Sequence, residues 1–235
     1  MEFGPTHTIF DSFDSQWCLD QCQQIINDFP MTESSNISGK FFHTYKTWHF
    51  HKTSQIPIIK EFNNVVEKHK HQFEKVYNKP LEIDWVVLAY TSDDSEEMSV
   101  WHKDRYYLDG QFHITVQGNA NIDVVKDGEV FNLQIPNGTA WYLNATHYYH
   151  KICPGVGNER FELTAPVNMR PALREWKLKA NPNDKWQHVK GDNPEYVKYK
   201  EFLVKGQEQA VRDGTASNIS VAYPVDLQPY IRAGK

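Results

Sequence analysis

Three residues in the middle of the chain have the types and spacing of a metal site: His102, Asp104 and His150. A histidine and a carboxylate two positions apart point to the same face of an extended segment, because strand side chains alternate. A second imidazole from a later strand, His150, would complete a set of two histidines and one carboxylate. This facial set leaves coordination positions open on a non-haem Fe(II) centre. The residue types therefore predict a non-haem iron site.

Arg160 lies ten positions after His150 and begins an alternating run. In that run Arg160 would share one side of a strand with Glu162 and Thr164. A guanidinium that projects into a mostly apolar barrel needs an anionic partner, and its planar fork suits a carboxylate held by two hydrogen bonds. A dicarboxylate co-substrate would meet that need.

The same residues give the sequence a family resemblance. It resembles the Fe(II)/2-oxoglutarate-dependent oxygenases, in particular their aspartyl/asparaginyl β-hydroxylase-like and prolyl-hydroxylase-like branches. The matching segments, in order, are His102-x-Asp104, Gln111 to Ile114, Trp141 to Asn144, His150 and Arg160. The resemblance covers roughly residues 81 to 167 and implies a mostly β fold with flanking helices around a double-stranded β-helix, a jelly-roll, cupin-like core.

The resemblance implies a role for each candidate site residue. His102, Asp104 and His150 would bind Fe(II) and form the catalytic centre, with 2-oxoglutarate and O2 as co-substrates. Arg160 would bind the distal carboxylate of 2-oxoglutarate. The family has a histidine that contacts the co-substrate at the spacing of His113; alternatively, His113 is an inward histidine bonded to a neighbouring strand.

Other histidines compete for the metal. His147 is an alternative to His150, but it lies in a predicted turn, and the ten-residue step from His150 to the arginine matches the family. His49 and His51 would share a strand face, although no carboxylate follows at strand spacing and two lysines nearby add positive charge. We therefore predict structural or substrate-rim roles for that pair.

Hydrophobic periodicity predicts the elements that position these residues. Apolar side chains at helical spacing predict one helix that begins at residue 14 or 15, and a second over residues 57–77 that backs the sheet. Cys18 and Cys22 lie on the apolar side of the first helix. Because no further cysteine pair exists to close a zinc site, we interpret them as core side chains.

Several short strands and tight turns follow. Alternation and β-branched content predict strands over residues 41–52, 81–91, 111–117 and 139–143. Asp127-Gly128 forms the tip of a predicted hairpin, and Gly138 ends a second turn. Such close spacing indicates an antiparallel sandwich or barrel rather than a βα repeat. The acidic run over residues 92–97 is a solvated loop or an acidic lip that could attract a cationic substrate.

At 235 residues the chain is long enough for one well-buried core, and length alone allows one domain or a small second one. With the family resemblance, we predict a single oxygenase domain over residues 1–235. Residues 1–80 would flank the core, 81–167 would form it, and 168–235 would be a helical extension. A net charge of -5 argues against a nucleic-acid binder. With no recognisable signal peptide, no apolar run of membrane length and only three cysteines, we predict a cytoplasmic protein without a membrane partner. The oligomeric state stays open.

The predicted function is hydroxylation of a C–H bond in an amino acid or an amino-acid side chain, with release of succinate and CO2 from 2-oxoglutarate. The substrate would be a small molecule or a peptidyl amino acid. A cupin-like metal-dependent isomerase or another metal-binding barrel is the alternative, and it would not need Arg160 as a clamp. A non-catalytic β-sandwich module is a further alternative. A halogenase is disfavoured by Asp104, since halide needs the position that a carboxylate fills.

Overall fold

The computed structural model of the protein describes residues 4–35, 45–91, 108–152, 159–168 and 194. His102, Asp104, the acidic run over residues 92–97 and almost all of the predicted helical extension lie outside these residues. The elements, in chain order, are β1 (His7–Ser12), α1 (Ser15–Asp28), β2 (Glu33–Ser35), β3 (Tyr45–His51), α2 (Pro57–Tyr77), β4 (Trp85–Thr91), β5 (Gly110–Gln117), β6 (Ala120–Lys126), β7 (Glu129–Ile135), β8 (Thr139–Leu143), β9 (His150–Ile152) and β10 (Arg160–Val167).

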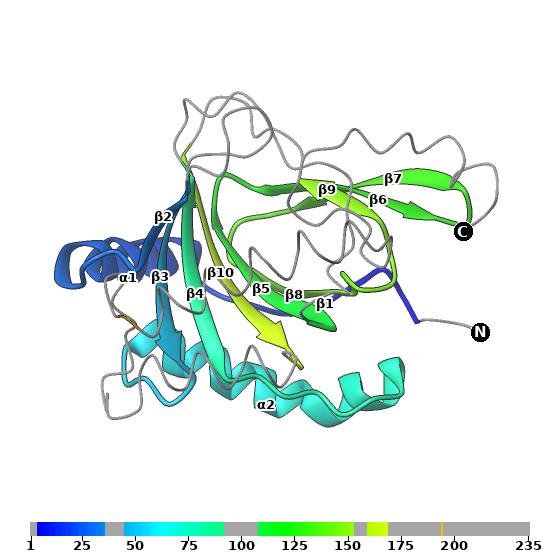
Figure 1. The fold of residues 1–235 in the computed structure, drawn as a ribbon, viewed down its shortest axis with the longest axis horizontal. Coiled ribbons are helices and arrows are strands. Elements are labelled where there is room, and N and C mark those ends of the chain that lie inside the picture. The colour runs from blue at the N-terminus through cyan, green and yellow to red at the C-terminus, as the bar shows by residue number, and fades with distance from the viewer. Residues whose placement is uncertain (1–3, 36–44, 92–107, 153–158, 169–193, 195–235) are drawn as a thin grey trace.

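The strands form two antiparallel sheets (Figure 1). The larger sheet has the order β1-β8-β5-β10-β4-β3-β2, and the smaller has the order β7-β6-β9. The chain leaves the larger sheet after β5, returns at β8, leaves again for β9 and returns at β10. This alternation between two facing sheets is the jelly-roll arrangement, so the predicted fold class is confirmed.

Helix α1 begins where the sequence predicts. The carboxylate of Asp14 accepts a hydrogen bond of 2.8 Å from the backbone N–H of Trp17, which is the usual N-cap arrangement. Cys18 and Cys22 are fully buried on the inner side of the helix. Burial raises the pKa of Cys18 to about 12 and also raises that of Cys22, so both remain thiols. The prediction that they are core side chains is confirmed.

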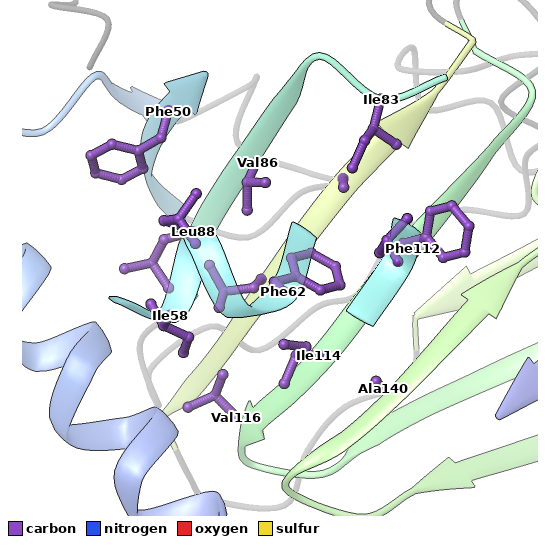
Figure 2. Close-up of a cluster of buried hydrophobic side chains, with 14 of the residues drawn as sticks. Phe50, Ile58, Phe62, Ile83, Val86, Leu88, Phe112, Ile114, Val116 and Ala140 are labelled. Atoms are coloured by element: carbon purple, nitrogen blue, oxygen red, sulfur yellow. The ribbon is translucent and has the colours of Figure 1, made fainter. Parts of the chain in front are cut away.

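Helix α2 packs across one face of the larger sheet (Figure 1). Ile58 and Phe62 from the helix lie against Leu88 and Ile114 from the strands, as Figure 2 shows. Val76, which fits the apolar pattern of the helix, is 44% exposed instead. Neither helix of the described part of the chain is long and apolar enough to cross a membrane.

The opposite face of the larger sheet meets the smaller sheet around a second core. This second core joins Trp141 and Leu143 of β8 to apolar side chains of β6 and of the adjoining segments. Its buried members are Leu108, Ala120, Ile122, Val124, Ile135, Trp141, Leu143 and Ala145. Side chains of the larger sheet that do not face the helices therefore point into the space between the two sheets.

Candidate functional site

Polar side chains from three adjacent strands lie on the inner face of the larger sheet. Phe112 and Ile114 of β5 belong to the core under the helices, so His113 between them points to the inner face. His113 lies opposite Thr164 of β10 on one side and opposite Trp141 of β8 on the other. The alternation predicted for residues 160–164 is confirmed by the burial of Phe161 and Leu163 under the helices.

Glu162 connects two of these side chains through its carboxylate. Its Oε1 lies 3.0 Å from Nδ1 of His113, and its Oε2 accepts a hydrogen bond of 2.7 Å from Nη2 of Arg160. Glu162 is 7% exposed and His113 is 5% exposed. We call these three residues the Glu162 cluster. Such charge-assisted bonds are stronger than neutral ones, and here they lie away from solvent.

The cluster keeps Glu162 ionised. Burial by itself would raise the pKa of Glu162, but the charges of Arg160 and His113 and their hydrogen bonds outweigh burial and hold the pKa below its ordinary value of 4.5. An ionised carboxylate only accepts hydrogen bonds, so Nδ1 of His113 carries the proton.

Two nitrogens of the cluster are not satisfied. Nε2 of His113 and Nε of Arg160 are buried and have no hydrogen-bond partner among the residues that the structure describes. The ring of His113 stacks on Trp141, with ring centroids 4.2 Å apart and an interplanar angle of 15°. The indole N–H of Trp141 donates to the hydroxyl of Thr115 at 3.1 Å and is therefore occupied. Buried polar atoms normally find partners, so these two nitrogens mark a place for a ligand.

His150 lies on the other sheet. Strand β9 pairs with β6, where His150 is opposite Val124, and its side chain is buried. Nδ1 of His150 lies 3.2 Å from the carbonyl oxygen of Tyr148. Because a carbonyl can only accept, Nδ1 carries a proton in this contact. Nε2 is therefore the ring nitrogen that could bind a divalent metal, and the role of His150 as a ligand stays a prediction.

Neither a family model nor a curated protein matches this sequence. Solved structures, however, share its fold. A prolyl hydroxylase from Trichoplax adhaerens, in complex with a hypoxia inducible factor peptide, has a TM-score of 0.57 at 11% identity over 69% of this chain and 83% of that chain. A Pseudomonas putida prolyl-4-hydroxylase has a TM-score of 0.53 at 11% identity, over 68% of this chain and 90% of that chain. A 2OG-Fe(II) oxygenase family protein from Burkholderia pseudomallei has a TM-score of 0.51 at 14% identity, over 69% of this chain and 85% of that chain.

The chain has the fold of the 2-oxoglutarate–Fe(II) oxygenases. The resemblance found in the sequence is thereby confirmed for the fold, and the oxygenase fold places Arg160, the first residue of β10, on the inner face of the sheet. At these identities the likeness does not extend to the substrate.

The structure places the predicted site residues in two groups. Arg160 and His113 come together through Glu162, whereas His150 belongs to the smaller sheet. The two remaining predicted iron ligands lie outside the described residues. Within the described residues no group of three or more metal-binding side chains occurs, so the metal triad stays a prediction.

The rival histidines have other surroundings. His147 lies in the turn before β9, where its backbone N–H donates to the carbonyl of Asn144. His49 is buried, with Nε2 at 3.1 Å from the hydroxyl of Thr47. Nδ1 of His51 lies 3.0 Å from the hydroxyl of Thr53. These contacts agree with the structural roles expected for the His49 and His51 pair.

Glu162 is the residue of the site that sequence reasoning did not single out. The alternation puts Glu162 on the same strand face as Arg160, but it predicts no role for this carboxylate. The available signal was a carboxylate in a strand that is otherwise apolar or uncharged after Arg160. The spacing alone could not show that one carboxylate oxygen of Glu162 would contact His113 of β5 and the other would accept from Arg160 of β10.

Proposed function

We propose that the protein is an Fe(II)- and 2-oxoglutarate-dependent dioxygenase that hydroxylates a C–H bond of an amino acid or of an amino-acid side chain, releasing succinate and CO2. The observation that carries the proposal is a guanidinium on the inner face of an oxygenase fold, with a buried Nε that has no partner among the described residues. A dicarboxylate supplies the acceptor that this nitrogen lacks.

The proposed roles fall to two sets of residues. His102, Asp104 and His150 would hold Fe(II), which supplies the activation of O2 and of the 2-oxo acid. Arg160 would orient the co-substrate by binding its distal carboxylate. His113 would border the same carboxylate through the ring edge that carries Nε2. The surrounding apolar side chains of the second core would exclude water from the reacting atoms.

The substrate class rests on the resemblance and on one neighbour of the same fold. The Trichoplax adhaerens prolyl hydroxylase was solved with a peptide of the hypoxia inducible factor oxygen degradation domain. Peptidyl amino acids therefore belong in a substrate screen together with free amino acids.

Succinate release tests the proposal. The purified protein is incubated with Fe(II), ascorbate, O2 and 2-oxoglutarate, with and without a panel of amino acids and short peptides. We expect succinate that depends on both Fe(II) and 2-oxoglutarate and that increases with the true substrate. A metal-dependent isomerase or a non-catalytic barrel gives no succinate under any condition, and that result would reject the proposal.

A further inference from the structure

The head group of Arg160 is fixed by a contact with a neighbouring side chain. Its Nη2 donates to Oε2 of Glu162 at 2.7 Å, while its Nε is buried and has no hydrogen-bond partner among the described residues. The side chain of Arg160 is 13% exposed. Because an arginine stem is long and has several rotatable bonds, a strong contact at the head decides where the remaining N–H donors point.

Glu162 is itself fixed, because it ends a row of contacts that crosses three strands. The indole N–H of Trp141 on β8 donates to the hydroxyl of Thr115 on β5 at 3.1 Å. The ring of His113, also on β5, stacks on Trp141 with centroids 4.2 Å apart, and its Nδ1 lies 3.0 Å from Oε1 of Glu162. All four of these side chains are buried. The position of the Arg160 head group therefore depends on β5 and β8 as well as on β10.

The length of the Glu162 side chain matches the two contacts that it makes. Glu162 lies opposite Thr115 of β5, whereas His113 lies opposite Thr164, so Glu162 reaches His113 along the diagonal between the strands. One carboxylate oxygen contacts this diagonal neighbour, and the other accepts from Arg160 on the same strand. We expect aspartate at this position, which is one methylene shorter, to lose at least one of the two contacts.

We propose that Glu162 is a positioning residue that fixes the direction of the Arg160 N–H donors and thereby selects the chain length of the 2-oxo diacid. The inference rests on the proposed function, in which the metal site binds the 2-oxo acid end of the co-substrate and Arg160 binds the distal carboxylate. When both ends of a ligand are held, a fixed donor accepts only a chain that spans the distance between them. A donor that can move accepts longer and shorter chains as well. Glu162 acts through Arg160 and needs no contact with the ligand.

Two other roles of Glu162 predict a different behaviour. If Glu162 only neutralised the charge of Arg160, its removal would strengthen the binding of all diacids alike. If Glu162 only stabilised the fold, its removal would weaken the binding of all diacids alike. Both roles leave the ratio of the affinities for diacids of different length unchanged, whereas positioning changes that ratio.

Binding of three diacids measures this ratio. Oxaloacetate, 2-oxoglutarate and 2-oxoadipate, which differ by one methylene each, are titrated into the Mn(II)-loaded protein without O2, and binding is followed by calorimetry. Because a methylene that does not fit costs roughly 10- to 200-fold in recognition, the wild type should prefer 2-oxoglutarate over the other two by a factor of this size. In Glu162→Ala the preference should fall below about tenfold.

Glu162→Asp separates position from charge. This variant keeps the carboxylate and should therefore keep the fold, but it should lose the chain-length preference as Glu162→Ala does. Asp11→Ala is the matched control. The carboxylate of Asp11 also contacts a cationic side chain and a histidine, Lys68 at 3.5 Å and His69 at 3.4 Å, but it lies between β1 and α2 on the helix side of the larger sheet. Asp11→Ala should keep the preference of the wild type.

The outcomes distinguish this inference from the proposed function. A wild-type preference in either Glu162 variant would overturn the inference and leave the proposed function intact, and so would a wild type that binds the three diacids equally. The same loss of preference in Asp11→Ala would also overturn the inference. If Glu162→Ala does not fold, Glu162→Asp decides alone. No binding of any of the three diacids to the wild type would instead reject the proposed function.

Discussion

Arg160 is the residue that most separates an oxygenase from a generic metal barrel. Removal of a clamp that binds the ground and transition states equally should mainly raise the KM for 2-oxoglutarate and affect kcat less. Breaking a buried charge-paired contact costs on the order of 3 to 5 kcal/mol, so Arg160→Met should weaken co-substrate use by roughly two to four orders of magnitude. Arg160→Lys keeps the charge but loses the planar fork, so its KM for 2-oxoglutarate should lie between those of the wild type and Arg160→Met. A 2-oxoglutarate titration at saturating Fe(II) measures this, and an unchanged KM in Arg160→Met would place the clamp elsewhere.

The three predicted metal ligands should each be essential for turnover. Alanine at His102, Asp104 or His150 should abolish succinate formation, while the circular dichroism spectrum stays native because the apolar cores hold the fold. His147→Ala is the matched control, and it should retain activity. The opposite pattern, with activity kept in His150→Ala and lost in His147→Ala, would show that the second imidazole was assigned to the wrong histidine.

Glu162 should make stability depend on acid pH. Its pKa in the folded protein is lower than the ordinary value of 4.5, so the folded state loses its proton more readily than the unfolded state. The stabilisation is therefore complete above about pH 4.5 and is lost as pH falls through the depressed pKa. Urea unfolding from pH 7 down to about pH 3 should show a steeper loss of stability in the wild type than in Glu162→Gln. Parallel curves would contradict the assignment.

At the scale of elements, Gly138 connects three parts of the fold. Its N–H donates to the carbonyl of Thr115 on β5, and its carbonyl accepts from Phe13 just before α1. Its φ is +78°, and a Cβ at this position would lie 2.4 Å from the carbonyl oxygen of Phe13. Gly138→Ala therefore combines backbone strain with a clash against a backbone atom.

We expect Gly138→Ala to destabilise the protein by about 1 to 3 kcal/mol or more, measured by urea unfolding. Gly128→Ala is the matched control, because Gly128 also has a positive φ of 82° but lies at the tip of the hairpin between β6 and β7. Gly128→Ala should lower the free energy of unfolding by less than Gly138→Ala does. Equal losses in the two variants would mean that the contact with Phe13 contributes nothing.

At the scale of the whole molecule, metal binding should stabilise the folded chain. The predicted ligands come together only in the folded state. Metal at about 100 times its Kd should therefore raise the free energy of unfolding by about 2.7 kcal/mol. Zn(II) and Co(II) should bind at least as well as Fe(II) by the usual affinity order, but only Fe(II) should support oxidation, and the other ions should inhibit.

Thermal unfolding with and without each ion checks the stabilisation, and His150→Ala should remove it. Succinate assays with mixed ions check the inhibition. Full activity after rigorous chelation, or oxidation supported by Zn(II), would reject the iron mechanism.

The local features of this protein follow from short-range patterns in its sequence. Residues 57–77 form a helix with its apolar side inward because a 3.6-residue period is a property of neighbouring residues. The two-residue period likewise put Arg160 and Glu162 on one strand face, opposite Phe161. Asp127 and Gly128, with φ of 52° and 82°, form the predicted hairpin turn because both can adopt a left-handed conformation.

Which of these faces meet depends on how distant strands pair in the folded chain. Strand β10 lies between β4 and β5, and this order brings the carboxylate of Glu162 to His113, 49 positions earlier in the chain. His150, in contrast, lies on strand β9 of the smaller sheet, whereas the three residues of the Glu162 cluster lie on the larger sheet. Pairing between distant strands depends on the register and packing of the entire sheet, and no local pattern contains it. The sequence could therefore predict that Arg160 needs an anion, but it could not show that Glu162 already supplies one.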